Sequence, residues 1–291
     1  MEHILELNNL CKNYDNFSLK NISLKLEKGT LNGFIGPNGA GKTTTIHSIL
    51  NLVKPDNGSI KILGLDSVAD EINIKSKVGA ILDDGHFYEE MTMEKMTQLI
   101  APMYNTWNKH DYQDYMSIFG LDKNKKIKDL SRGMRMKYSL AIGLSHNAEL
   151  FIMDEPTAGL DPLIRRELID IINDIVMTKN KTVLMSTHIT SDLDKTVDYL
   201  YFIYDGNMIL QGGKDDLKES HSIVKGSLSQ LPAEYETYFV SIDKYKYGFE
   251  GLTDQKMQVK NLLSGQATYE MPSIEDLMLY YIRRYQQCIQ T

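Results

Sequence analysis

Residues 36–45 read GPNGAGKTTT and fit the pattern G-x-x-x-x-G-K-[ST] at every fixed position. Before them, residues 31–35 form a short apolar run that predicts a buried strand, and after them apolar residues recur at helical spacing between 46 and 53. The glycines of this stretch free the backbone to take positive φ and to approach a polyphosphate closely, with successive N–H groups pointing inward. The stretch therefore predicts a phosphate-binding loop between a strand and a helix. The alternative is a glycine-rich turn that binds nothing.

The side chains of this loop have distinct predicted roles. Lys42 is expected to place its ammonium on the β- and γ-phosphates of a nucleotide, and the Thr43 hydroxyl to ligate the Mg²⁺ that bridges them. The helix that follows adds the positive end of its dipole. The residues expected to contact the nucleotide are Gly36, Pro37, Asn38, Gly39, Ala40, Gly41, Lys42, Thr43 and Thr44.

Size and composition restrict the class of protein. The chain has 291 residues, 42% of them hydrophobic, which is enough for one full α/β core and a small appendage. A net charge of −7 disfavours nucleic acid as a partner, because a large footprint needs clustered Lys and Arg. Cys11 and Cys288 suit a reducing compartment. The sequence has neither a basic-then-apolar leader nor a long apolar run, so we expect a cytosolic protein.

Acidic residues follow two further apolar runs. Residues 150–153 are fully apolar and lead into Asp154 and Glu155. Asp154 is predicted to hold the water shell of Mg²⁺, and Glu155 to accept a proton from the water that attacks the γ-phosphate. Residues 78–82 lead into Asp83, which either reaches the Mg²⁺ or its waters or is a solvated turn residue.

Three weaker signals stay open on local sequence alone. Tyr14, on the loop between two predicted strands, either stacks on an adenine ring or is an ordinary half-buried tyrosine. Ser131, in the run LSRGM at 130–134, either caps a helix or helps to form a second anion site. His188, after a buried strand at 183–186, either hydrogen-bonds the γ-phosphate or caps the strand end.

Taken together, these residues resemble the nucleotide-binding subunit of an ATP-binding cassette (ABC) transporter over about residues 4–215, with the elements in the family order. Tyr14 resembles the A-loop aromatic, 36–43 the Walker A motif and Asp83 the Q-loop position. The run 130–134 resembles the signature, 150–155 the Walker B motif, 158–161 the D-loop with Asp161, and His188 the switch histidine. The resemblance implies ATP and Mg²⁺ as cofactors. It also implies that Ser131, Gly133 and Asp161 contact the nucleotide, that Glu155 and His188 are catalytic, and that Thr43, Asp83 and Asp154 face the metal.

Two positions depart from the family pattern. The signature reads LSRGM in place of LSGGQ, so Arg132 and Met134 replace a glycine and a glutamine while Ser131 and Gly133 are kept. We expect nucleotide binding to survive this change. Asp83 stands where glutamine is usual, and its shorter, charged side chain bears on the metal contact and on coupling to a partner.

The resemblance also implies the fold. Residues 1–215 are expected to form an α/β P-loop NTPase cassette, with a RecA-like core sheet, an antiparallel β subdomain and a helical subdomain inserted at about 86–147. Residues 216–291 are expected to add a small α+β accessory segment, with strand-like tyrosine-rich runs and a helix that starts after Pro272-Ser273. This segment is either a dimerisation or regulatory element or a helix packed back on the core.

In the family, two such chains close head to tail around ATP, so the resemblance implies a homodimer or a paralogous ATPase subunit. It further implies a polytopic membrane subunit docked on the helical subdomain, and a location on the inner face of the cell membrane. The lone cassette with LSRGM is similar to bacterial export and antimicrobial-resistance cassettes, such as bacitracin-type and phenol-soluble-modulin-type exporters. The expected function is ATP-driven export of a peptide or antimicrobial-type substrate. The alternatives are a soluble ABC regulator acting on ribosomes or DNA, and a metabolic kinase, which leaves Ser131, Asp161 and His188 unexplained.

Overall fold

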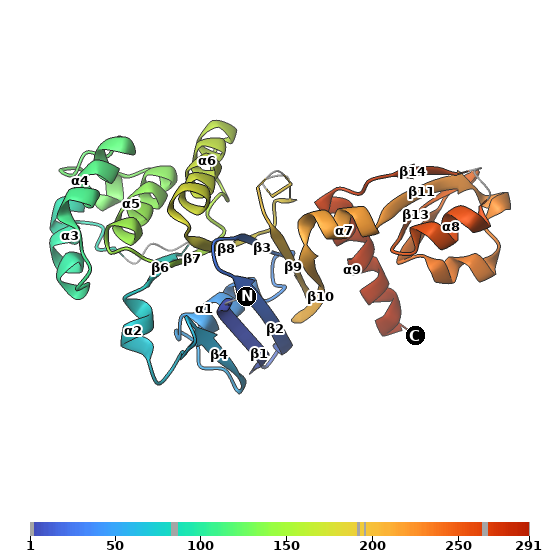
Figure 1. The fold of residues 1–291 in the computed structure, drawn as a ribbon, viewed down its shortest axis with the longest axis horizontal. Helices are drawn as coiled ribbons and strands as arrows, with labels where there is room; N and C mark the ends of the chain where they lie inside the picture. Colours follow the sequence, from blue (N-terminus) through green and yellow to red (C-terminus); the bar gives the residue numbers. More distant parts are fainter. Residues whose placement is uncertain (1–2, 83–86, 191–192, 195, 264–266, 291) are drawn as a thin grey trace.

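The computed structural model describes residues 3–82, 87–190, 193–194, 196–263 and 267–290 (Figure 1). A central sheet lies in the middle of an elongated molecule. Helices α3 to α5 lie at one end, and the C-terminal sheet with α8 lies at the other. Within the described ranges, none of the helices combines the length and the apolar character needed to span a lipid bilayer.

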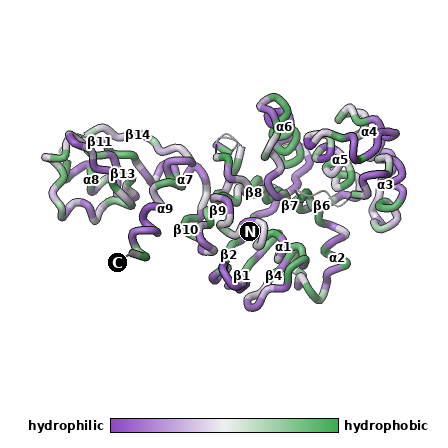
Figure 2. The backbone as a smooth tube through the Cα atoms, turned by 180° about the vertical axis from the view of Figure 1, so that it is seen from behind, coloured by the Kyte–Doolittle hydropathy of each residue, from purple (hydrophilic) through white to green (hydrophobic). Residues whose placement is uncertain are grey.

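The central sheet is mostly parallel and positions the candidate site. Among the described residues its strands follow the order β10-β9-β3-β8-β7-β6, and β10 alone runs antiparallel to its neighbour. They are β3 (Leu31–Ile35), β6 (Val78–Ile81), β7 (Leu150–Asp154), β8 (Thr182–Thr187), β9 (Tyr199–Tyr204) and β10 (Asn207–Gly213). Every residue of β3, β7 and β8 is buried, because helices cover both faces of a parallel sheet. Figure 2 marks the hydrophobic residues of β7 and β8 in green.

Parallel pairing brings the ends of these strands to one edge. β3 pairs with β8, and β8 pairs with β7, all in the same direction. Their carboxyl ends therefore point to the same side, and the residues that follow each strand become neighbours. This topology places the loop at 36–41, the acids at 154–155 and His188 together.

A second, antiparallel sheet covers α1 (Lys42–Ile49). In the described part of the chain its order is β2-β1-β4-β5, from β1 (His3–Tyr14), β2 (Phe17–Glu27), β4 (Asn57–Ile62) and β5 (Leu65–Asp66). The short helix α2 (Glu71–Lys75) then leads to β6. Since β1 extends through Tyr14, this residue is the last of a strand, and the expectation of a loop position is wrong.

Each α-helix of the helical region begins after a residue whose side chain caps it. Its helices are α3 (Met93–Ile100), α4 (Lys109–Ile118) and α5 (Arg132–Ser145), with 3-10 turns at Ala101–Met103 and Ile127–Asp129. Thr92, Asn108 and Ser131 accept backbone hydrogen bonds at the starts of α3, α4 and α5, which satisfies otherwise unpaired N–H groups. Next to this region lies α6 (Pro162–Lys179), which follows β7.

The C-terminal part has its own sheet, in the order β12-β13-β11-β14 among the described residues. Its elements are α7 (Lys214–Ser220), β11 (Ser222–Ser227), β12 (Ser241–Lys244), β13 (Gly248–Thr253), α8 (Lys256–Leu262), β14 (Thr268–Glu270) and α9 (Ile274–Gln290), with 3-10 turns at Leu228–Gln230 and Ala233–Tyr238. The predicted helix start is confirmed: the Asp276 carboxylate accepts from the Ser273 backbone N–H at 2.9 Å, and Ser273 Oγ accepts from the Asp276 N–H at 3.1 Å. Ile274, Leu277 and Tyr280 of α9 join the main hydrophobic core.

Two buried histidines give the fold a predicted pH dependence. His146 follows α5 and stacks on Tyr104 with ring centroids 3.9 Å apart, and His221 precedes β11. Burial lowers the pKa of both below the ordinary 6.5, although hydrogen bonds to backbone carbonyls act in the opposite direction. The native protein therefore keeps them neutral at a pH where the unfolded chain begins to bind protons.

We expect the free energy of unfolding to fall as the pH drops below about 6.5, by up to about 1.4 kcal/mol per pH unit for each histidine. The stability is fully present above the unfolded-state pKa and is lost toward the lower native-state pKa. Urea unfolding between about pH 7.5 and 5.5 would measure this slope. His146→Gln should make the slope shallower, and a variant as steep as the wild type would contradict the prediction.

Candidate active site

The loop between β3 and α1 has the backbone that the motif requires. Gly39 and Gly41 adopt φ of +80° and +111°, and Gly41 precedes the first residue of α1. A Cβ on Gly36 would lie 2.2 Å from the carbonyl oxygen of Ile203, and one on Gly41 would lie 2.5 Å from Leu19. The loop is thus packed closely against β9 and β2. Its backbone continues directly into α1, so the N–H groups of the loop and of the helix N-terminus are adjacent.

The Lys42 side chain reaches back from the start of α1 to the beginning of the loop. Its side chain is buried, and Nζ donates to the carbonyl oxygens of Gly36 at 2.7 Å and Pro37 at 3.2 Å. Nζ also lies 3.1 Å from Glu155 Oε1. A buried ammonium beside a helix N-terminus suits an anionic phosphate, because the ammonium and the helix N-terminus are both positive and the phosphate is negative. Of the other loop residues, Asn38, Gly39 and Thr43 are exposed, Pro37 and Thr44 are half-buried, and Ala40 is buried.

The acids of β7 are held by β8. Asp154 is buried at the end of its strand and accepts a hydrogen bond from Ser186 Oγ at 2.5 Å. Glu155 adopts φ of +48°, and its backbone N–H donates to Ser186 Oγ at 3.0 Å. A left-handed backbone is uncommon outside glycine and costs about 1–3 kcal/mol, and such strain concentrates at functional sites. Ser186 thus holds the acid pair, although no motif in the sequence marks this serine. The available signal was one serine at the end of an apolar strand.

His188 completes the group. Its Nδ1–H donates to Glu155 Oε2 at 2.8 Å, and its side chain is 41% exposed. One carboxylate of Glu155 therefore bridges Lys42 and His188, which come from α1 and from the end of β8. The arrangement brings together a cation, a proton acceptor and a solvent-facing imidazole, the set needed to bind a phosphate and to activate water beside it.

The donor set is compatible with Mg²⁺. The hydroxyl of Thr43 and the carboxylate of Asp154 are oxygen ligands, and this ion is usually held by one or two carboxylates together with substrate phosphates. In the part of the chain that the structure describes, no group of three or more His, Cys, Asp or Glu side chains forms a metal cage. Asp83, the third predicted metal residue, lies outside the described residues.

Tyr14 stands beside the loop. It pairs with Phe17 across the turn from β1 to β2, and the Phe17 ring lies 2.9 Å from where a Cβ on Gly41 would be. The Tyr14 side chain is exposed, with Lys12 Nζ 5.6 Å from its ring centroid. An aromatic face is therefore available to a base next to the phosphate loop.

Ser131, Gly133 and Asp161 form a separate group. Ser131 Oγ caps α5 by accepting from the Met134 N–H at 3.3 Å, and Asp161 Oδ1 caps α6 by accepting from the Leu163 and Ile164 N–H groups at 3.1 Å. A Cβ on Gly133 would lie 2.6 Å from Ile164, so the starts of α5 and α6 are in contact. Among the described residues, no hydrogen bond or ion pair joins this group to Lys42, Asp154, Glu155 or His188.

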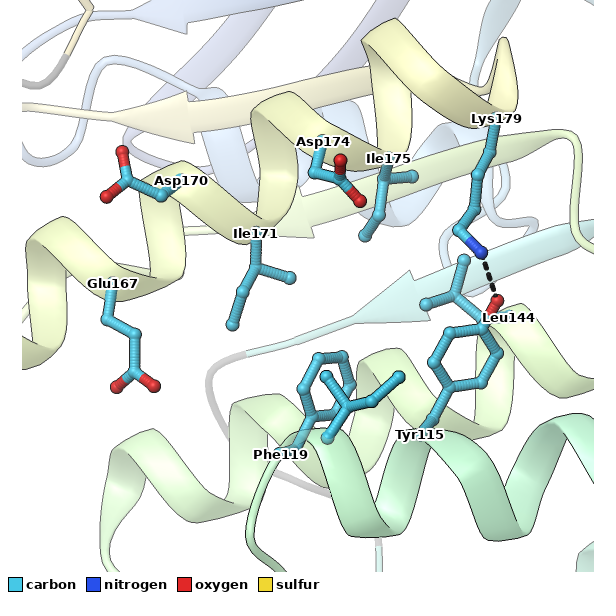
Figure 3. Close-up of a pocket in the computed structure, with 10 residues that line it drawn as sticks. Tyr115, Phe119, Leu144, Glu167, Asp170, Ile171, Asp174, Ile175 and Lys179 are labelled. Atoms are coloured by element: carbon cyan, nitrogen blue, oxygen red, sulfur yellow. Dashed lines mark hydrogen bonds between the residues drawn. The ribbon is translucent and has the colours of Figure 1, made fainter.

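Two mostly apolar grooves lie away from these residues. The first, about 330 Å³, lies between α4 and α6; Tyr115 and Phe119 face Ile171 and Ile175 across it (Figure 3). The second, about 340 Å³, lies between β6, the end of α1 and the helical region. Its lining includes Leu52, Gly79, Met103, Tyr104 and His146.

Comparison with known proteins agrees with this geometry. A family model described as "ABC transporter" matches residues 19–158. The chain is 32% identical to the bacitracin transport ATP-binding protein BcrA of Bacillus licheniformis, over 75% of this chain and 72% of the relative. It is 31% identical to the lantibiotic transport ATP-binding protein SrtF of Streptococcus pyogenes, over 74% and 95%. A solved ATP-binding subunit of an ABC transporter superposes with a TM-score of 0.67 at 27% identity, over 74% of this chain and 92% of that chain. The expected cassette fold is confirmed.

Proposed function

Since this chain belongs to the ABC transporter family and is an ABC-type ATPase, we propose that it powers the export of a peptide or antimicrobial-type substrate through a separate membrane subunit. The observation that carries the proposal is the Glu155 carboxylate, 3.1 Å from Lys42 Nζ and 2.8 Å from His188 Nδ1. The named cargoes of two relatives, bacitracin and lantibiotic, support the substrate class.

The residues of the site have separate proposed roles in binding and hydrolysing ATP. The loop at 36–44 and Lys42 hold the phosphates of ATP, and Tyr14 offers its ring to the base. Thr43 and Asp154 would hold Mg²⁺, with Asp83 as a further candidate ligand, and the ion would supply positive charge to offset that of the phosphates. Lys42 exchanges Glu155 for phosphate oxygens when nucleotide binds. That exchange frees Glu155 Oε1, a buried oxygen that is paired with Lys42 Nζ in this structure, to accept a proton from the attacking water. His188 orients that carboxylate and the γ-phosphate.

A second chain is needed to complete the enclosure. Ser131 and Asp161 are exposed at the starts of α5 and α6, and among the described residues no hydrogen bond or ion pair joins either to Lys42, Glu155 or His188 of its own chain. A helix N-terminus of this kind suits the γ-phosphate held by another copy. We therefore propose that ATP closes two cassettes head to tail, as a homodimer or with a paralogous subunit, and that hydrolysis reopens them.

The membrane subunit is proposed to dock on the helical region at about 86–147, in the groove against β6. This groove is largely apolar, and Met103 on its rim is 74% exposed. Exposed apolar surface of this kind suits burial against a partner. The chain would then lie on the cytoplasmic face of the membrane, outside the bilayer.

Co-purification separates this function from its alternative. Tagged chain, expressed at native level and extracted in mild detergent, should retain a polytopic membrane protein, whereas a soluble regulator would retain ribosomes or DNA. Met103→Glu should reduce the yield of that membrane protein, because it places a charge in the apolar groove. Ile118→Glu, at a 72% exposed position on the lining of the groove between α4 and α6, is the matched control and should leave the yield unchanged. Recovery of ribosomes without a membrane protein would overturn the transport proposal.

A further inference from the structure

The turn between β9 and β10 is joined to the phosphate-binding loop. Asp205 and Gly206 adopt φ of +45° and +69°, as in a tight two-residue hairpin turn. The Gly206 N–H donates to the Ala40 carbonyl oxygen at 3.0 Å, and the Gly206 carbonyl accepts from the Lys20 N–H at 2.8 Å. A Cβ on Gly206 would lie 1.8 Å from the Ser18 carbonyl oxygen, so the turn is tightly seated against β2.

This contact decides how one N–H group of the loop points. A peptide unit is planar and trans, so the C=O of Ala40 and the N–H of Gly41 point in opposite directions. Because Gly206 holds that carbonyl on the outer side of the loop, the Gly41 N–H faces the inner side. Gly39 and Gly41, on either side of Ala40, have little steric preference for one backbone conformation. The hydrogen bond from Gly206 therefore fixes a peptide orientation that the loop residues alone do not fix.

Helix α9 holds the turn from the far side. Tyr285 Oη accepts a hydrogen bond from Asn207 Nδ2 at 2.7 Å and donates to Asp205 Oδ2 at 3.4 Å, so one hydroxyl ties both residues that flank Gly206. The Tyr285 ring also packs edge-on against Tyr204, with centroids 5.5 Å apart. In Figure 1, α9 lies between β10 and the C-terminal sheet.

The other half of α9 is firmly anchored. Ile274, Leu277 and Tyr280 are buried in the main core, so the helix cannot shift without exposing them. The exposed end that carries Tyr285 is therefore presented to the turn at a fixed position.

We propose that Tyr285 is a positioning residue for nucleotide binding, which acts through the turn at 205–207 to orient the Ala40–Gly41 peptide toward the phosphates. The inference rests on the proposed role of residues 36–44 in holding those phosphates. It makes the C-terminal segment part of the nucleotide site's support.

The test compares two hydroxyl deletions on α9 in the full chain. Tyr285→Phe removes the bonds to the turn and keeps the ring. Tyr281→Phe is the matched control, because the Tyr281 hydroxyl bonds His221 Nε2 at 2.8 Å on the side of α7 and β11. Loss of the turn contacts should weaken the binding of Mg·ADP, measured by calorimetry, by about two- to tenfold, the worth of one or two hydrogen bonds. KM for ATP should rise by a similar factor with kcat nearly unchanged, and the control should keep wild-type values of both.

The outcomes are distinct. Wild-type affinity in Tyr285→Phe, or equal weakening in both variants, would overturn the inference, the latter because it indicates general loosening of α9. A lower melting temperature with unchanged KM would also overturn it. Lys42→Ala tests the proposed site separately: if that variant binds Mg·ADP as the wild type does, the assignment of the loop fails, and the positioning role fails with it.

Discussion

Glu155→Gln is expected to lower the rate of ATP hydrolysis by about 10²–10⁴-fold, the usual contribution of a positioned general base. The amide keeps the shape of the carboxylate but cannot accept a proton from water. It also loses the ion pair to Lys42 Nζ at 3.1 Å, a contact that nucleotide phosphates would replace. Phosphate release from Mg·ATP at saturating concentration measures the effect.

Glu149→Gln is the matched control, since Glu149 stands just before the other end of the same strand and pairs with Lys77 at 3.2 Å. It should hydrolyse ATP at close to the wild-type rate. Turnover of Glu155→Gln within about threefold of wild type, well short of the 10²–10⁴ range, would reject Glu155 as the base.

The same variant also reports on assembly. Because ATP is retained when it is not hydrolysed, Glu155→Gln with Mg·ATP should accumulate as a dimer in sedimentation, and should return to monomer with ADP. Ser131→Arg in that background should prevent association, because it places a bulky cation where a capping hydroxyl is proposed to face the partner's phosphate. A strictly monomeric Glu155→Gln would contradict the two-chain enclosure.

Lys42→Ala is expected to weaken nucleotide binding itself by about 10- to 100-fold, since hydrogen bonds to charged groups contribute about 1.5–3 kcal/mol. The reason is structural, because Nζ is buried at the base of the loop, 2.7 Å from the Gly36 carbonyl oxygen. In this position its positive charge would lie next to a phosphate bound by the loop. Calorimetric titration with Mg·ADP gives the affinity without hydrolysis.

Lys54→Ala, an exposed lysine shortly after α1, is the control and should bind as the wild type does. Removal of Lys42 also leaves Glu155 without its cation, so thermal unfolding of each variant should accompany the titration. A folded Lys42→Ala that binds Mg·ADP with unchanged affinity would place the phosphates elsewhere.

Much of the site could be predicted from the sequence, because its residues lie close together within short segments of the chain. The glycines, Lys42 and Thr43 lie within one loop, and a parallel sheet carries the ends of β3, β7 and β8 to one edge whatever the details of packing. For the same reason, the helix starts at Ser131 and Asp161 follow from single capping side chains.

Other features depend on contacts between distant segments. The left-handed backbone of Glu155 is held by the hydrogen bond from its N–H to Ser186 Oγ. The contacts of Glu155 with Lys42 and His188 depend on the side-chain rotamers that these residues adopt in the folded protein. Tyr14 was expected on a loop, but pairing with Phe17 extends β1 to include it.

By itself, the sequence determined the phosphate loop and the acids that follow the apolar run at 150–153, since these rest on residue type and spacing, and the resemblance of the motifs to the ABC family implied the cassette fold. Only the tertiary structure decided that α9 returns to hold the turn at 205–207 against Ala40. No local pattern encodes that contact, because it joins residues about 80 and 165 positions apart (285 against 205–207, and 206 against 40). Such pairings depend on the burial of Ile274, Leu277 and Tyr280 in the main core, which brings α9 to the turn, and not on spacing along the chain.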